Sequence, residues 1–176
     1  VIDDVIFDMK RFENNYYDAY DRVLLEAYCC KDSLMGSHND STEGCFCIRL
    51  TERHDLTSPA GLDRGFKAIA LADYLVVPLL VWVSVPCTGG SFWQRINKVK
   101  GPKTEEKIRK HRELCDKLLP NALKIAASAM LSGVGRVVIE WPEGCEYWND
   151  PRVSQFISDH ELIVTKLDGC AFGLVS

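Results

Sequence analysis

The chain has 176 residues, of which 47% are apolar and 26% charged, and its formal net charge at pH 7 is -4. This length suits one domain with an ordinary hydrophobic core, so we expect a single domain over residues 1–176. The acidic balance excludes a general attraction to phosphate backbones, and nucleic-acid binding would require a local basic patch or another domain. The longest apolar run is broken by Pro78 and too short to span a bilayer, and no signal-peptide pattern opens the chain. We therefore expect an intracellular protein without a membrane span.

The first predicted elements are a helix and two strands. Residues 9–21 carry aromatic side chains at helical spacing, which predicts an amphipathic helix in an N-terminal extension over residues 1–21. Residues 23–28 and 44–50 are short apolar segments that are typical of strands. The polar loop between these strands is placed where an α/β protein holds a cofactor.

A helix and a buried strand follow. Ser58 is followed by Pro59, which is the typical order of an N-cap residue and a proline in the first turn of a helix. This predicts a helix from there to about Leu71. Residues 75–85 are almost continuously Val and Leu, which indicates a strand covered on both faces at the middle of a parallel sheet.

A second long helix lies in the middle of the chain. Residues 92–97 follow a Gly-Gly turn, and the basic residues 98–103 are interpreted as a solvated loop. A helix capped by Thr104 is predicted to kink at Pro120 and to continue to Leu131.

The last predicted elements are two strands around a short helix. Residues 136–141 form a strand, and a helix capped by Asp150 covers residues 150–157. Residues 161–167 form the final predicted strand. Strands that alternate with helices in this way predict an α/β fold, with a doubly wound, mostly parallel sheet in three layers.

The eight cysteines favour reduced thiols over zinc binding or a disulfide scaffold. No Cys-x-x-Cys pair occurs, although such pairs are common in zinc sites. Most of the cysteines fall within or just after predicted strands, where reduced cysteine behaves as a small hydrophobic residue. We expect mainly buried thiols and no metal site, with structural disulfides or a metal as the alternative.

Three strand ends carry unusual chemistry: Cys87 after Pro86, Glu140, and residues 168–169. A cysteine beside the N–H groups of a turn could act as a thiolate nucleophile, and a neighbouring carboxylate could hold or protonate the heterocycle that it attacks. The competing interpretation makes Cys87 a buried thiol before a turn. Glu140 would then reach solvent or pair with Arg49 or Arg95.

These segments resemble a reduced, degenerate cytosine-C5 methyltransferase, an S-adenosylmethionine-dependent enzyme with a Rossmann-like fold. Residues 24–36 are similar to the family's cofactor loop, and His54-Asp-Leu-Thr57 is similar to its Gly-Asp-Ile-Thr segment. Pro86-Cys87 resembles the Pro-Cys nucleophile motif, and Glu140-Trp-Pro142 resembles the Glu-Asn-Val motif. Residues 168–175 resemble the segment before the family's arginine motif.

The resemblance implies that the chain binds S-adenosylmethionine and transfers its methyl group to a nucleic-acid cytosine. Cys87 would add to C6 of the ring, Glu140 would contact N3, and C5 would attack the methyl group. The residues that the resemblance places near the cofactor are Cys29, Asp32, Ser33, Glu52, Asp55 and Pro86. The alternative for Asp32, Ser33 and Asp55 is that they cap helices and turns, as these residue types commonly do.

Departures from the family pattern support a second hypothesis, a catalytically inactive domain of the same fold that serves in a larger protein assembly. The cofactor loop has one glycine, and Trp141 and Pro142 replace the Asn and Val of the glutamate motif. The sequence contains no counterpart of the Gln-Arg-x-Arg motif or of a target-recognition domain. The chain is also similar to methyltransferase-like segments of mobile-element polyproteins, which implies a retrotransposon-derived pseudoenzyme.

Two further interpretations concern Cys87 and the aromatic residues. A thiol-dependent hydrolase at Cys87 would need a histidine within hydrogen-bond reach, and the sequence offers no obvious one. Four aromatic residues either stack on a base or an adenine ring or shield the open edge of the sheet: Trp93, Trp141, Tyr147 and Trp148.

Overall fold

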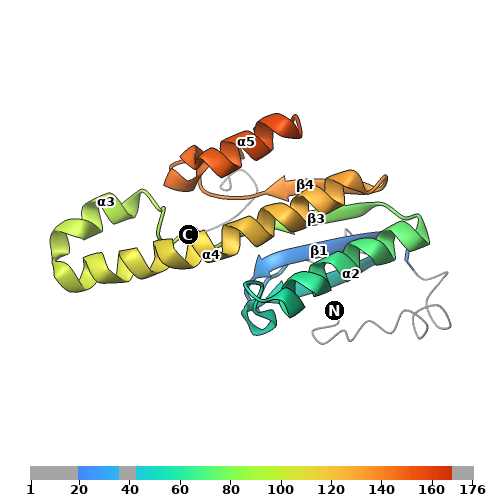
Figure 1. Ribbon diagram of the computed structural model, residues 1–176, viewed down its shortest axis with the longest axis horizontal. Helices are drawn as coiled ribbons and strands as arrows, with labels where there is room; N and C mark the ends of the chain where they lie inside the picture. Colours follow the sequence, from blue (N-terminus) through green and yellow to red (C-terminus); the bar gives the residue numbers. More distant parts are fainter. Residues whose placement is uncertain (1–19, 36–42, 168–176) are drawn as a thin grey trace.

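A computed structural model describes residues 20–35 and 43–167, which build an α/β arrangement around one four-stranded sheet (Figure 1). The strands are β1 (Arg22–Cys29), β2 (Cys45–Thr51), β3 (Leu79–Val83) and β4 (Gly135–Ile139). They are ordered β2-β1-β3-β4, and every neighbouring pair is parallel. The predicted α/β class with a parallel sheet is confirmed.

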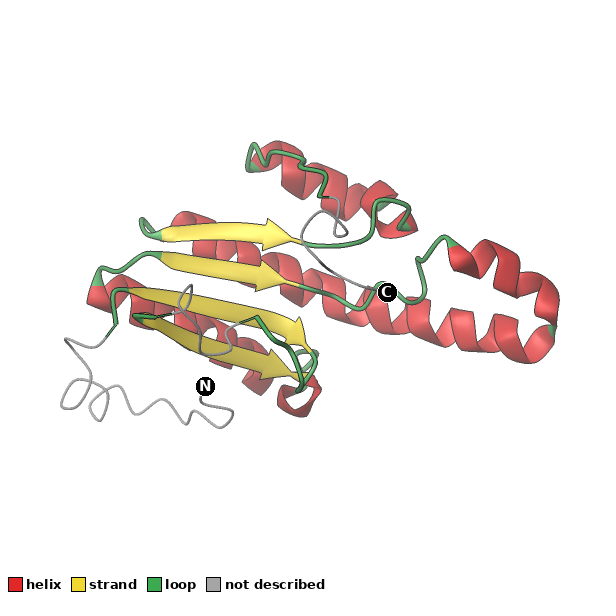
Figure 2. Ribbon diagram, turned by 180° about the vertical axis from the view of Figure 1, so that it is seen from behind, coloured by secondary structure: helices red, strands yellow, loops and turns green. Residues whose placement is uncertain are grey.

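Two long helices, α2 (Pro59–Leu75) and α4 (Pro102–Leu131), lie on the same face of the sheet (Figures 1 and 2). The connections from β2 to β3 and from β3 to β4 run in the same direction across the sheet. Because such crossovers are right-handed, their helices fall on one face. The step from β1 to β2 runs in the other direction along the strand order. The third layer of the predicted architecture stays a prediction.

The hydrophobic core lies between the sheet and these two helices. Alternate residues of each strand enter it, as the two-residue period of a strand requires, and Leu25, Val81 and Val83 are fully buried there. Small residues let the helices approach: a Cβ added at Gly65 of α2 would lie 2.8 Å from Ile125 Cδ1 of α4. Each large apolar side chain buried in this way stabilises the fold by about 1.5–3 kcal/mol.

The structure confirms two of the three predicted N-caps of helices. The Ser58 side chain caps α2 and Asp150 caps α5 (Pro151–Asp159), which confirms both predicted caps. The cap of α4 is Gly101 and not Thr104, because Pro102 takes the first position of the helix, where its missing N–H costs nothing. Residues 92–103 form α3 (Trp93–Asn97), the short helix η3 (Lys98–Lys100) and the start of α4, so the predicted loop over residues 98–103 is wrong.

Two predicted strands differ from the structure. The central strand begins at Leu79 and not at residue 75, because Leu75 still belongs to α2, which ends where Val76 turns into the left-handed region. Residues 161–167 form no strand; Ile163 and Val164 are exposed to solvent. An apolar segment forms a strand only where it pairs with a sheet edge, and this segment does not.

Three further observations bear on the sequence predictions. The predicted helix over residues 9–21 lies outside the described residues except for Tyr20 and Asp21. Residues 168–169 lie wholly outside them. Within the described part of the chain, no helix has both the length and the apolarity needed to cross a membrane. The seven cysteines in this part are free thiols, and four of them are buried.

Candidate functional site

The carboxyl ends of all four strands meet at one edge of the sheet, and most of the predicted site residues lie there (Figure 2). Cys29 ends β1, Glu52 follows β2, Cys87 lies shortly after β3, and Glu140 follows β4. The chain leaves β1 and β3 in opposite directions, so the gap between these two strands is the topological switch point, where ligands of open α/β sheets bind.

The side chains of Cys87 and Glu140 lie near enough for the Glu140 charge to act on the thiol. Burial raises the pKa of the Cys87 thiol above its ordinary value; a backbone hydrogen bond lowers it and the Glu140 charge raises it. The resting thiol is therefore protonated at neutral pH, although the thiolate is the reactive form. Glu140 itself is exposed, and its N–H donates to Val83 O at 3.1 Å, which fixes its backbone beside β3.

Neither arginine predicted as a partner of Glu140 pairs with it. Arg49 pairs with Glu26 at 3.2 Å, and Arg95 pairs with Glu146 at 3.4 Å. Glu140 forms no ion pair with any other residue that the structure describes, and its carboxylate reaches solvent. This leaves the carboxylate available to a ligand at the edge of the sheet.

The turn after Cys87 is packed and not open. Gly90 N–H donates to Cys87 O at 2.9 Å, and Gly90 O accepts from Glu146 N–H at 2.7 Å. A Cβ at Gly90 would lie 2.9 Å from the Tyr147 ring, and one at Gly89 would collide with the Tyr147 hydroxyl. The two glycines therefore allow Tyr147 and α4 to approach the turn, and Pro86, which precedes it, is exposed.

The aromatic residues after β4 close this end of the core. Trp141 is buried, and its indole N–H donates to Val85 O at 2.6 Å. Its ring makes edge-on contacts with Tyr147 and Trp148. These three residues shield the sheet edge, as the second interpretation of the aromatics predicts, whereas Trp93 is exposed.

The residues after β1 are largely engaged within the protein. The buried Cys29 thiol donates to Glu26 O at 3.6 Å, and burial raises its pKa to about 12. The Ser33 hydroxyl donates to the Glu26 carboxylate and accepts from Met35 N–H at 3.3 Å. Asp32 is exposed. Of the residues predicted in this loop, Asp32 has the carboxylate that is open to a ligand.

Among the residues after β2, some form hydrogen bonds within the protein, and Glu52 is exposed. Thr51 and His54 form a reciprocal cap around η2 (Glu52–His54), in which Thr51 N–H donates to His54 Nδ1 at 2.9 Å. Asp55 has φ 38° and its carboxylate accepts from Thr57 N–H at 3.3 Å, so it is a turn residue. Glu52 is exposed at the end of β2, where dinucleotide-binding folds place an acidic residue that binds ribose hydroxyls.

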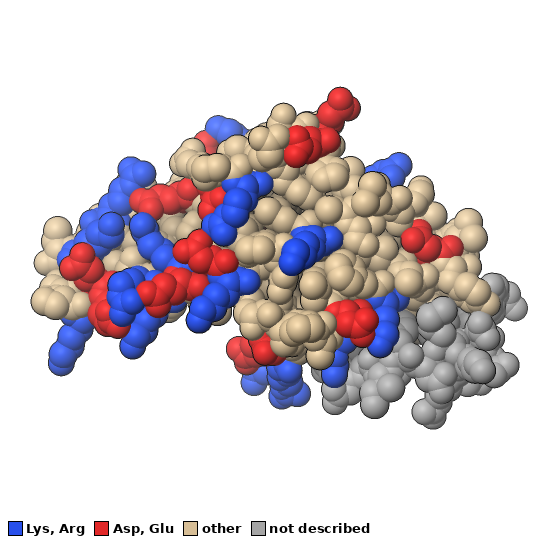
Figure 3. Space-filling model, in the orientation of Figure 1, with Lys and Arg blue, Asp and Glu red and all other residues tan. Residues whose placement is uncertain are grey.

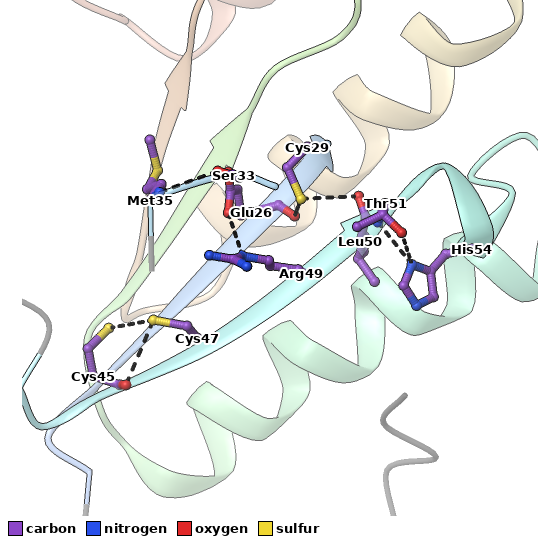
Figure 4. A network of polar contacts seen from close by, with 10 residues as sticks. All are labelled: Glu26, Cys29, Ser33, Met35, Cys45, Cys47, Arg49, Leu50, Thr51 and His54. Carbon is purple, nitrogen blue, oxygen red and sulfur yellow. Dashed lines mark hydrogen bonds and ion pairs between the residues drawn. The ribbon is translucent and has the colours of Figure 1, made fainter. Parts of the chain in front are cut away.

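Sequence reasoning missed a buried ion pair between Glu26 and Arg49 on neighbouring strands (Figure 4). The two residues are directly opposite each other and lie on the face away from α2 and α4, beneath Ser33. Their side chains are 5% and 8% exposed, and Arg49 Nη2 has no hydrogen-bond partner among the described residues. The sequence carried one signal of this pair: Glu26 and Arg49 are each a charged residue inside an apolar segment predicted to be a strand.

Two thiols of β2 lie on the same face. Cys45 Sγ and Cys47 Sγ are 3.8 Å apart (Figure 4), as residues two apart in a strand should be near each other. Burial raises the pKa of Cys47 to about 11, so this thiol is not reactive at neutral pH. The described residues contain no group of His, Cys, Asp and Glu side chains that could hold a metal ion.

Comparison of the chain with models of protein families, with curated proteins and with solved structures found no match.

Proposed function

We propose that this chain is a methyltransferase-like domain of Rossmann-like, three-layered architecture that binds S-adenosylmethionine at the carboxyl edge of its sheet. Its substrate would be a nucleic-acid cytosine, with Cys87 as the nucleophile and Glu140 as the residue that holds the base. The observation that supports this proposal best is that Cys87 and Glu140 follow the adjacent parallel strands β3 and β4 at the same end of the sheet.

The residues at the switch point fit an adenosine-type cofactor in part. The exposed carboxylate of Asp32 follows β1, which flanks the switch point, and that of Glu52 follows β2, the strand beside β1. Carboxylates accept hydrogen bonds from ribose hydroxyl and amino groups. Ser33 and Asp55 make internal hydrogen bonds and are less suited to this role. When bound, S-adenosylmethionine would supply the methyl group.

The electrostatics of Cys87 and Glu140 suggest how the thiol is activated. While Glu140 is ionised, its charge helps to keep the thiol protonated. An amino group of a bound cytosine that donates a hydrogen bond to this carboxylate would offset its charge, so that the carboxylate would oppose the thiolate less. Binding of the base would then favour the reactive form of Cys87.

Transfer of a labelled methyl group from S-adenosylmethionine to cytosine-containing oligonucleotides tests this proposal. We expect Cys87→Ser to abolish transfer, because a hydroxyl is a far weaker nucleophile than a thiolate. The matched control is Cys30→Ser, which changes an exposed thiol at the same edge of the sheet and should retain transfer. Equal transfer by wild type and Cys87→Ser would contradict the proposal.

A second candidate function is a catalytically inactive domain that serves as an interaction subunit. The internal hydrogen bonds of Ser33 and Asp55 favour it, because they use polar groups that a cofactor would otherwise contact. The packed Gly89-Gly90 turn favours it as well. Under this alternative the folded chain would bind no S-adenosylmethionine.

A further inference from the structure

An arm made of α3, η3 and the first turns of α4 extends past the carboxyl edge of the sheet (Figure 2). We call residues 92–113 the basic arm. The 30 residues of α4 give it a length of about 45 Å, whereas a five-residue strand such as β3 spans about 17 Å. The first turns of α4 therefore extend beyond the strands, although Ile108 is buried and Arg112 packs on the Gly89 turn.

The basic arm has a charge opposite to that of the whole chain. It contains eight Lys and Arg residues against three Glu, a net charge of +5 in a chain whose total is -4. Figure 3 shows many basic side chains over the arm, with acidic side chains among them. Charge of this sign and density on one projection attracts a polyanion, even though the molecule as a whole is acidic.

Several lysines of the arm are free to bind such a partner. Arg109 pairs with Glu106 and Glu113, and Arg112 pairs with Glu146. Lys98, Lys100 and Lys103 are exposed and form no ion pair with any residue in the described ranges. These three ammonium groups lie within six residues at the tip of the arm.

Exposed aromatic side chains lie at the start of α3, in the same arm as these lysines. Trp93 is 67% exposed and Phe92 is 50% exposed, and their ring centroids are 6.3 Å apart. The Arg95 guanidinium carbon lies 5.6 Å from the centre of the Phe92 ring. Exposed aromatic rings beside basic residues are what single-strand-binding proteins use to stack bases and to contact phosphates.

We propose that the basic arm binds single-stranded nucleic acid, with Trp93 and Phe92 stacking on bases and Lys98, Lys100 and Lys103 contacting phosphates. A single strand suits this surface better than a duplex, because the bases of a duplex are already stacked on one another. The arm needs neither the cofactor nor Cys87 for this role. The inference is therefore independent of the proposed methyl transfer.

Fluorescence anisotropy with labelled mixed-sequence oligonucleotides, in the absence of S-adenosylmethionine, tests the proposal. Single-stranded RNA and DNA are titrated separately, so the tighter complex identifies the preferred sugar. We expect affinity to fall as salt rises from about 50 to 200 mM. The double variant Lys98→Glu/Lys100→Glu should weaken binding at least about tenfold. It should also reduce the slope of log affinity against log salt concentration by about 1.4, because two phosphate contacts are lost. Trp93→Ala should weaken binding by about 5- to 100-fold, and Trp93→Phe should retain most of it.

The control variant Lys67→Glu/Lys124→Glu makes the same change in charge on α2 and on the far part of α4, and should bind like wild type. Equal losses in both double variants would overturn the proposal, because binding would then follow total charge. Absence of binding at about 100 μM protein, the weak limit of non-specific binding, would also overturn it. So would binding of phosphatidylserine vesicles through the same residues without binding of oligonucleotides, which would assign the arm to a lipid surface.

Discussion

At the scale of single residues, Glu26 and Arg49 form a buried ion pair between two neighbouring strands of the sheet. Both side chains are withdrawn from water, and the carboxylate also accepts from the Ser33 hydroxyl. Removal of one partner leaves an uncompensated charge in a buried position, which is far more costly than removal of both. The pair thus holds the connection after β1 against the sheet through Ser33.

We predict that Glu26→Gln and Arg49→Met each lower the free energy of unfolding by about 3–5 kcal/mol. The double variant Glu26→Gln/Arg49→Met should lose less than the sum of the two single losses, because no unpaired charge remains. Urea denaturation of the four proteins measures this coupling. Additive losses would mean that the two side chains do not stabilise each other.

The thiol of Cys87 gives a second prediction at this scale. Because the Glu140 charge raises the pKa of Cys87, Glu140→Gln should lower that pKa and move the pH profile of alkylation toward lower pH. Modification of Cys87 by iodoacetamide, followed by mass spectrometry near neutral pH, should therefore be faster in the variant. Glu143→Gln, which changes an exposed carboxylate of the same loop, should leave the rate unchanged. A slower reaction in Glu140→Gln would contradict the prediction, because it would mean that the Glu140 charge lowers the pKa of Cys87.

At the scale of elements, α4 runs through Pro120 as one helix, although proline lacks the N–H that would bond to Asp116. We predict that Pro120→Ala raises the free energy of unfolding by about 1–3 kcal/mol, since a proline inside a helix is unfavourable and its restriction of the unfolded chain offsets part of that cost. Urea denaturation measures the change. Lys117→Ala, at an exposed position of the same helix, should change stability by less than about 0.5 kcal/mol. A loss of stability in Pro120→Ala would contradict the prediction.

Elements with local signals could be predicted from the sequence, and elements that depend on distant partners could not. Ser58 and Asp150 bond to the helix that follows them, so their sequence neighbours are sufficient to predict the caps. Residues 161–167 contain the short apolar run Leu-Ile-Val, which is typical of a strand, but pairing requires a sheet edge elsewhere in the chain. The opposition of Glu26 and Arg49 depends on the register of β1 and β2, which neither segment encodes alone.

At the scale of the whole molecule, the order β2-β1-β3-β4 brings the ends of four separate segments to one edge. Alternation of strands and helices predicted that Cys87 and Glu140 follow strands that end on the same side of the sheet. It could not predict that Ser33 and Asp55 would make internal hydrogen bonds or that burial would raise the pKa of Cys87, because these depend on packing. The basic arm extends from the same edge, so a nucleic acid bound there would lie near the candidate site.

Calorimetric titration of the folded chain with S-adenosylmethionine and S-adenosylhomocysteine tests the central claim most directly. We predict micromolar binding of both compounds, weakened at least about tenfold by Glu52→Ala, because one lost hydrogen bond to a charged group costs about 1.5–3 kcal/mol. Glu105→Ala, on the basic arm, should bind like wild type. Absence of heat at millimolar ligand, from protein that still unfolds cooperatively, would contradict the claim and would favour an inactive interaction subunit.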